Sequence, residues 1–261
     1  MPMFNPESAD ITAGISDEYE SRSREAFEGF PKSYSLEAKG IREAIDDLRA
    51  IPASVDRTVH EYRNWAGTDA TNPGVAEHAR SKSEAALETG TKALEGGWSE
   101  ISKRLDAFEA KARAKLFSDH PPATGDSVRA DLLMALDGTP DEALHDELGR
   151  LHASALRSSD DGFATLLRSP FTTWYLRGRF PLTEEGRARA DEVFDAFRSE
   201  VVQQVLEHTK DRDTDQRMTA LALDRMNAIR TVADLGHNEA YMRLDDVRQS
   251  VVDARRGQQL I

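Results

Sequence analysis

The chain has 261 residues, a net charge of −13 and no cysteine. This length allows one large helical domain or two smaller ones, each with a sizeable core. The acidic surplus argues against nucleic acid or an anionic membrane as the main partner. The lack of cysteine excludes disulfides, thiolate metal sites and cysteine nucleophiles. Charged residues make up 31% of the chain and apolar residues 39%, which is typical of thin helical bundles that expose much surface.

We expect neither a targeting segment nor a membrane-spanning segment in this sequence. Residues 1–6 contain neither a basic stretch nor the apolar core of a signal peptide. No apolar run approaches the roughly 20 residues that a membrane-spanning helix needs. We therefore expect a protein of the cytoplasm or of an assembled particle.

The first part of the chain predicts an irregular arm and then three helices. Residues 1–15 hold two prolines and a glycine among small polar residues, so we expect an irregular N-terminal arm. A helix over 16–27 follows, with a serine cap and two acids in its first turn. Two more are expected over 35–50 and 54–65, separated by Pro52 because proline breaks helices.

The next helix, over about 73–117, carries the most specific pattern in the sequence. Apolar side chains recur at spacings of three, four and seven, as in a helix seam that packs against another helix. The seam consists of Leu87, Leu94, Trp98, Ile101, Leu105, Phe108 and Ala112. It packs either within the chain or against a second molecule, so its central members from Leu94 to Phe108 are candidate interface residues.

A glycine pair, Gly96 and Gly97, interrupts this seam. Two glycines inside a helix cost about 2 kcal/mol relative to alanines. We expect a hinge at this pair, where the long helix bends. The alternative is that another backbone approaches closely there.

A proline-rich linker over 118–127 predicts a boundary between two helical regions, 16–117 and 128–261, because two adjacent prolines cannot continue a helix. Beyond the linker, shorter helices precede a long C-terminal helical segment that Gly236 is expected to break. No segment shows the alternating pattern of a strand. The sequence therefore predicts an all-α fold, an elongated multi-helix bundle with a long central helix and no β-sheet.

The segment from about 163 to 180 is the best candidate for a binding surface, because tryptophan, tyrosine and arginine are enriched at interface hot spots. The candidate interface residues are Phe171, Trp174, Tyr175, Arg177 and Arg179. One alternative is that the segment is simply the core of the C-terminal half. Another is that it stacks on nucleic acid, for which residues 168–189 offer a basic strip; the surrounding acidity disfavours this alternative.

Motifs for metal or catalytic chemistry are incomplete. Glu142 and His145 have the spacing of one half of a di-iron site, but the chain contains no second such motif. His60 begins a zinc-protease pattern that ends in asparagine. The aspartates within 211–215 begin a calcium loop that lacks its glycine and glutamate. His145 and His152 lie two helical turns apart. We expect no metal, cofactor or catalytic residue.

These observations predict a non-enzymatic helical protein that acts as a structural, assembly or adaptor component, for example as a subunit of a virion. Its partners would be proteins, either further copies in an oligomer or other parts of a larger complex. The alternative is a helical enzyme whose acid–base or metal residues meet only in the fold. A buried cluster of carboxylates and histidines in a closed pocket would favour that alternative.

Overall fold

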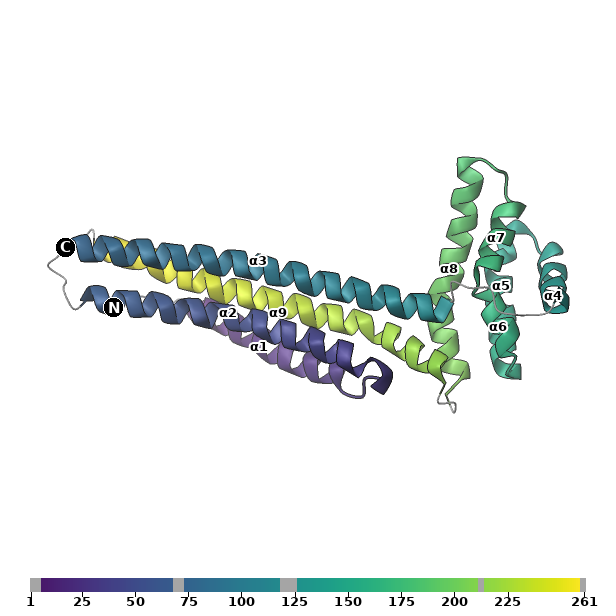
Figure 1. The fold of residues 1–261 in the computed structure, drawn as a ribbon, viewed down its shortest axis with the longest axis horizontal. Coiled ribbons are helices and arrows are strands. Elements are labelled where there is room, and N and C mark those ends of the chain that lie inside the picture. The colour runs from purple at the N-terminus through teal and green to yellow at the C-terminus, as the bar shows by residue number, and fades with distance from the viewer. Residues whose placement is uncertain (1–5, 68–72, 118–125, 211–213, 259–261) are drawn as a thin grey trace. The chain divides into compact units, whose positions relative to one another are not determined.

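A computed structural model describes residues 6–67, 73–117, 126–210 and 214–258 (Figure 1). These residues form nine α-helices and two short 3-10 helices without a strand, which confirms the predicted all-α fold. None of the described helices is both long and apolar enough to cross a membrane. The elements are α1 (Pro6–Phe27), η1 (Lys32–Tyr34), α2 (Ser35–Gly67), α3 (Pro73–Phe117), α4 (Asp126–Asp137), η2 (Asp141–Ala143), α5 (Leu144–Ser158), α6 (Asp161–Leu167), α7 (Pro170–Arg179), α8 (Glu184–His208) and α9 (Asp215–Gln258).

Helix α1 begins earlier than the sequence predicts. The irregular arm is expected to reach residue 15, whereas α1 begins at Pro6. A proline is tolerated in the first helical turn, because the N–H that it lacks has no partner within the helix there. Tyr19, Ser23 and Ala26 then form a buried face at helical spacing. This buried face lies in the predicted part of the helix, and its packing stabilises a helix that extends further toward the N-terminus than residue 16.

Helix α2 is continuous where two helices are expected. Pro52 lies inside it rather than between two shorter helices. A proline inside a helix costs about 3 kcal/mol, but Pro52 falls on the buried stripe of α2. The other members of that stripe are Ile41, Ile45, Leu48, Val55 and Val59. Burial of this stripe on both sides of the proline offsets the lost hydrogen bond.

The described helices belong to two compact units. Unit 1 comprises Met1–Phe30, Ser35–Asp106 and Asn227–Ile261, and unit 2 comprises Pro31–Tyr34 and Ala107–Met226. Helices α3 and α9 each contribute residues to both units. The units therefore do not follow the expected order of one N-terminal and one C-terminal region. Most of the expected linker, 118–125, lies outside the described residues, and α4 begins at Asp126.

In unit 1, α1, α2, α3 and α9 run beside one another around a narrow apolar core (Figure 1). Helix α3 supplies its heptad seam to this core, and α9 supplies a matching stripe. The buried residues are Leu87, Leu94, Ile101 and Leu105 from α3, and Ile229, Val232, Ala240, Leu244 and Val251 from α9. The seam of α3 in this unit is thus filled by helices of the same chain.

Glycines on α3 and α9 let α2 come close. A Cβ at Gly90 would lie 2.5 Å from Val55 Cγ2, and one at Gly236 would lie 2.7 Å from Ile45 Cγ2. Helix α9 is continuous through Gly236, so the expected break at this residue is wrong. The missing side chain serves helix packing instead, since even one additional methyl group would overlap a neighbour.

Helix α3 also continues through the glycine pair that predicts a hinge. A Cβ at Gly97 would lie 3.2 Å from Leu48 Cδ1, whereas one at Gly96 would meet nothing within 4 Å. A side chain of α2, rather than a second backbone, therefore occupies the space beside Gly97. The bend at Gly96 and Gly97 stays a prediction.

A buried ion pair links α2 to α9 within unit 1. Glu239 is 1% exposed; its Oε2 accepts a hydrogen bond from Arg49 Nε at 2.7 Å, and its Oε1 lies 2.6 Å from Arg243 Nη2. Arg49 continues this network to α1, because its Nη1 donates to Glu20 at 3.1 Å. Two guanidinium groups thus balance one buried carboxylate, which would be costly to bury alone.

Tyr19 of α1 completes this network. Its ring centroid lies 3.6 Å from the guanidinium carbon of Arg49, and its hydroxyl donates to Asp46 Oδ1 at 2.8 Å. Burial, together with the hydrogen bond to Asp46, raises the pKa of Tyr19 to about 12. The hydroxyl therefore remains a donor at neutral pH, and α1 is fixed to α2 by polar as well as apolar contacts.

In unit 2, α5 lies against α8, while α4, α6 and α7 pack around this pair. The core residues include Leu136 of α4, Leu144, Leu148 and Leu156 of α5, Leu166 and Leu167 of α6, Leu176 of α7, and Phe197, Val201 and Val205 of α8. The last turns of α3 and the first turns of α9 also belong to this unit. There, Tyr34 of η1 is hydrogen-bonded to Thr219 at 2.9 Å and packs edge-on against Phe108.

Removing the buried carboxylate should destabilise unit 1. In Glu239→Gln, Arg49 and Arg243 would lose the buried carboxylate that they share, and the free energy of unfolding should fall by about 3 kcal/mol. Urea titration followed by circular dichroism measures this change. Glu88→Gln, which breaks an exposed pair with Lys92, is the matched control and should leave the unfolding free energy unchanged. Equal effects in the two variants would contradict the structural role of Glu239.

The glycines of α3 should respond to alanine in opposite directions. Gly96→Ala should raise the free energy of unfolding by about 1 kcal/mol, because alanine is the better helix former and the site is open. Gly90→Ala should lower it by about 1 kcal/mol or more, since its methyl group would overlap Val55, which is stiff. Thermal and urea unfolding of both variants would test this. A destabilising Gly96→Ala would favour the hinge.

Candidate functional site: the Trp174 face of unit 2

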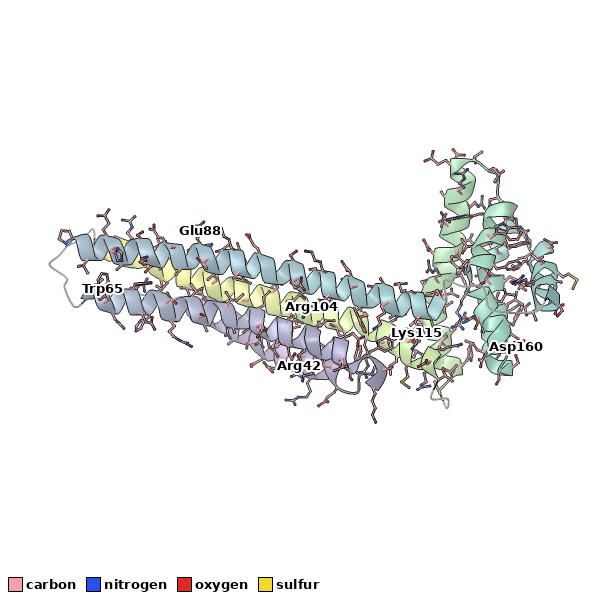
Figure 2. The ribbon with its side chains drawn as sticks, in the orientation of Figure 1. Arg42, Trp65, Glu88, Arg104, Lys115 and Asp160 are labelled. Atoms are coloured by element: carbon pink, nitrogen blue, oxygen red, sulfur yellow. The ribbon has the colours of Figure 1, made fainter. Side chains whose placement is uncertain are left out.

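The predicted binding segment folds as two short helices whose starts are fixed by side chains. Asp160 caps α6 by accepting a hydrogen bond from the backbone N–H of Phe163 at 2.9 Å (Figure 2). Ser169 caps α7 in the same way for Phe171, and Pro170 occupies the first helical turn. These caps satisfy amides that a helix start leaves without partners. The caps therefore fix where α6 and α7 begin, and with them the positions of the side chains on α7.

Helix α7 has one buried and one exposed face. Thr172 and Leu176 are buried against the rest of unit 2, whereas 67% of the surface of Trp174 is exposed. Phe171 and Tyr175 lie between these extremes, and the rings of Phe171 and Trp174 are 5.6 Å apart. The segment therefore includes core residues, as one alternative expected, but its tryptophan is not among them.

Arg179 joins α7 to the end of α4 and the turn after it. Its guanidinium donates to Asp141 Oδ1 at 2.9 Å and to the Tyr175 hydroxyl at 3.1 Å. It also donates to the carbonyl oxygens of Leu136 and Thr139. These carbonyls lie at and beyond the C-terminal end of a helix, where a cation is favourable. Arg179 is thus engaged inside unit 2.

Arg177 is engaged as well. Its Nε and Nη2 lie 3.0 and 2.8 Å from Asp191 Oδ1 of α8. Together with the Arg179–Asp141 pair, this contact neutralises the charges of the two arginines that are candidate interface residues in the sequence. The basic strip that nucleic-acid stacking would require is correspondingly weakened.

An open hollow of about 430 Å³ lies beside Trp174. The lining residues are Asp137, Trp174, Tyr175, Gly178 and Arg179. Tyr175 donates its hydroxyl hydrogen to Asp137 Oδ1 at 2.9 Å, and burial raises the pKa of that hydroxyl, so it stays protonated. We call this hollow, with the exposed indole, the Trp174 face.

The heptad candidates lie elsewhere and do not join the Trp174 face. Leu94, Ile101 and Leu105 are buried in unit 1, and Phe108 is buried in unit 2. Trp98 is only partly buried, and its ring stacks on that of His237 at 4.5 Å. The structure therefore groups three candidates, Trp174, Tyr175 and Arg179, around one hollow and places the seam residues in helix packing.

Two polar side chains, His152 and Arg168, are buried in the core of unit 2, and the sequence did not predict that they would lie together. His152 is fully buried, and its Nδ1 lies 2.7 Å from Gln204 Oε1 of α8. Arg168 is 2% exposed and donates to the Ala164 carbonyl at 3.1 Å. Burial lowers the pKa of Arg168 to about 10, so it remains a cation at neutral pH. Helical spacing placed His152 on one face with His145, but no sequence signal indicated that an arginine would be buried nearby.

The two histidines of α5, His145 and His152, have different polar partners. His145 contacts Glu200 through Nε2 at 3.0 Å and Asp146 through Nδ1 at 3.3 Å, so these carboxylates lie at opposite ring nitrogens. Within the described residues, no group of three or more histidine, aspartate or glutamate side chains could hold a metal ion. His152 has an amide rather than a carboxylate as its hydrogen-bond partner.

Comparisons with known proteins give no match, whether to a family model, a curated protein or a solved structure.

Acid should destabilise unit 2 through His152. Burial and the positive charge of Arg168 lower the pKa of His152 from 6.5 to about 4. Below about pH 6.5 the histidine is protonated in the unfolded chain but still neutral in the folded chain. Stability is therefore lost as the pH falls from about 6.5 toward about 4. Between about pH 7.5 and about pH 5, His152 should lower the free energy of unfolding by about 2 kcal/mol.

Urea titrations of the wild type and His152→Gln at both pH values would isolate this contribution. The variant should lose about 2 kcal/mol less than the wild type over the same interval. If the free energy of unfolding changes equally with pH in the two proteins, His152 is not the source of the acid sensitivity.

Proposed function

We propose that this chain is a non-enzymatic helical protein that acts as an assembly or adaptor component and binds a partner protein through the Trp174 face. The observation that carries the proposal is a tryptophan two thirds exposed on a capped helix, next to an open hollow. Exposed aromatic anchors of this kind contribute much of the energy of protein interfaces. An assembled particle such as a virion is one setting for such a protein.

Two further observations favour this surface over the heptad seam. The seam residues Leu94, Ile101 and Leu105 are already buried in unit 1, so they offer little area to a second molecule. The Trp174 face, in contrast, keeps its polar groups satisfied within unit 2. A partner that covered this face would bury apolar surface without leaving those polar groups unpaired.

The alternative of a helical enzyme receives less support. The buried histidine of unit 2 is enclosed by the core and is hydrogen-bonded to Gln204. A lowered pKa keeps His152 neutral at physiological pH, but a general base also needs access to a substrate. The hollow at Trp174 is lined instead by an indole, a phenol, the ion-paired Arg179 and an aspartate that accepts a hydrogen bond from the phenol.

A pair of tryptophan variants tests the proposed function. Trp174→Ala should weaken partner binding about tenfold or more while leaving the unfolding midpoint unchanged, because the indole contributes to binding rather than to the core. Trp65→Ala is the matched control, since Trp65 is 46% exposed and belongs to unit 1 (Figure 2). Sedimentation velocity over a wide concentration range would measure self-association of all three proteins. Capture with the same three proteins, immobilised, would measure binding of other partners.

A specific partner is one retained by the wild type and Trp65→Ala and lost with Trp174→Ala. If the wild type and Trp174→Ala retain the same proteins and sediment alike, the Trp174 face is not the binding surface. Circular dichroism confirms that each variant is folded before the comparison.

A further inference from the structure

The charges around the Trp174 face are unequally balanced. Arg177 and Arg179 are each paired with a carboxylate, at 2.8 and 2.9 Å. Asp137 is exposed, and its hydrogen-bond donor is the neutral hydroxyl of Tyr175. Within the described part of the chain, Asp137 forms no ion pair. After the internal pairs are made, a negative charge therefore remains at the rim of the hollow.

The shape and chemistry of the hollow suit a long cationic side chain. Gly178 adds no side chain to its lining, and a Cβ there would meet nothing within 4 Å. Trp174 lines the hollow with an exposed indole, and the indole is the aromatic ring that attracts cations best. Asp137 and Trp174 line the same hollow, so both are accessible to a cation that enters it.

We propose that the Trp174 face receives the guanidinium or ammonium end of an arginine or lysine side chain from a basic segment of the partner protein. The cation stacks on the indole of Trp174 and forms an ion pair with Asp137. The inference rests on the proposed function and adds the chemistry of the partner. The chain as a whole carries a net charge of −13, which attracts a basic partner at long range.

Titration with a small cationic probe tests this inference on the full chain. The probe is N-acetyl-arginine methylamide, and N-acetyl-citrulline methylamide is its uncharged counterpart of nearly the same shape. The readout is the indole N–H resonance of each of the three tryptophans, assigned by single substitution. Trp65 and Trp98 serve as internal controls for general effects of the probe.

The arginine probe should shift the Trp174 resonance in a saturable way, with little shift of the Trp65 and Trp98 resonances. The citrulline probe should bind about fivefold more weakly, because it lacks the charge that the indole and the carboxylate attract. Asp137→Asn should reduce arginine binding by a similar factor, about fivefold. Asp245→Asn, which removes an exposed carboxylate of unit 1, should leave it unchanged.

The inference is overturned if the Trp174 resonance moves no more than that of Trp65, or if both probes bind equally well. It is also overturned if Asp137→Asn has no effect while the variant is folded. These outcomes differ from failure of the proposed function. A partner lost with Trp174→Ala but retained by Asp137→Asn would keep the Trp174 face as the binding surface and reject the cationic contact.

Discussion

The carboxylate of Glu239 constrains how the helices of unit 1 pack. It is buried on α9 and is acceptable there only because Arg49 of α2 and Arg243 of α9 reach it. The guanidinium of Arg49 also stacks on the ring of Tyr19, so the same arginine contacts α1. Apolar stripes can slide by one helical turn and still bury similar area, whereas an ion pair and its hydrogen bonds fit a single register. The glycine at position 236 allows this register by letting α2 approach α9.

Arg179 has a comparable part in unit 2. By binding Asp141, the Tyr175 hydroxyl and the carbonyls at the end of α4, it fixes α7 against α4. An arginine used in this way is not available to a ligand. The consequence is that Trp174, which lines the same hollow but makes none of these polar contacts, remains the exposed feature of the segment. If Trp174 binds a partner as proposed, an indole held on a fixed helix would require little ordering of the protein, which favours affinity.

Much of the architecture could be predicted because it follows from local periodicity. The bounds of α3 agree with the predicted 73–117, and the all-α fold follows from the absence of strand patterns. The errors share one physical cause. Pro52 and Gly236 carry local preferences against helix interiors, but packing of a long buried stripe outweighs a penalty of about 1–3 kcal/mol. Local propensity therefore located helices better than it located their breaks.

For the candidate site, the sequence determined the residue types and their clustering in one short aromatic and arginine-rich segment. Only the tertiary structure decided which members are exposed and which are paired within the chain. It paired Arg177 and Arg179 with carboxylates 14 and 38 residues away in the sequence, on other helical elements, and it left Trp174 exposed beside Asp137. Helical periodicity tells which side chains share a face, but the partner of a charge depends on which other helix lies opposite. That information resides in contacts between distant segments, and no local pattern carries it.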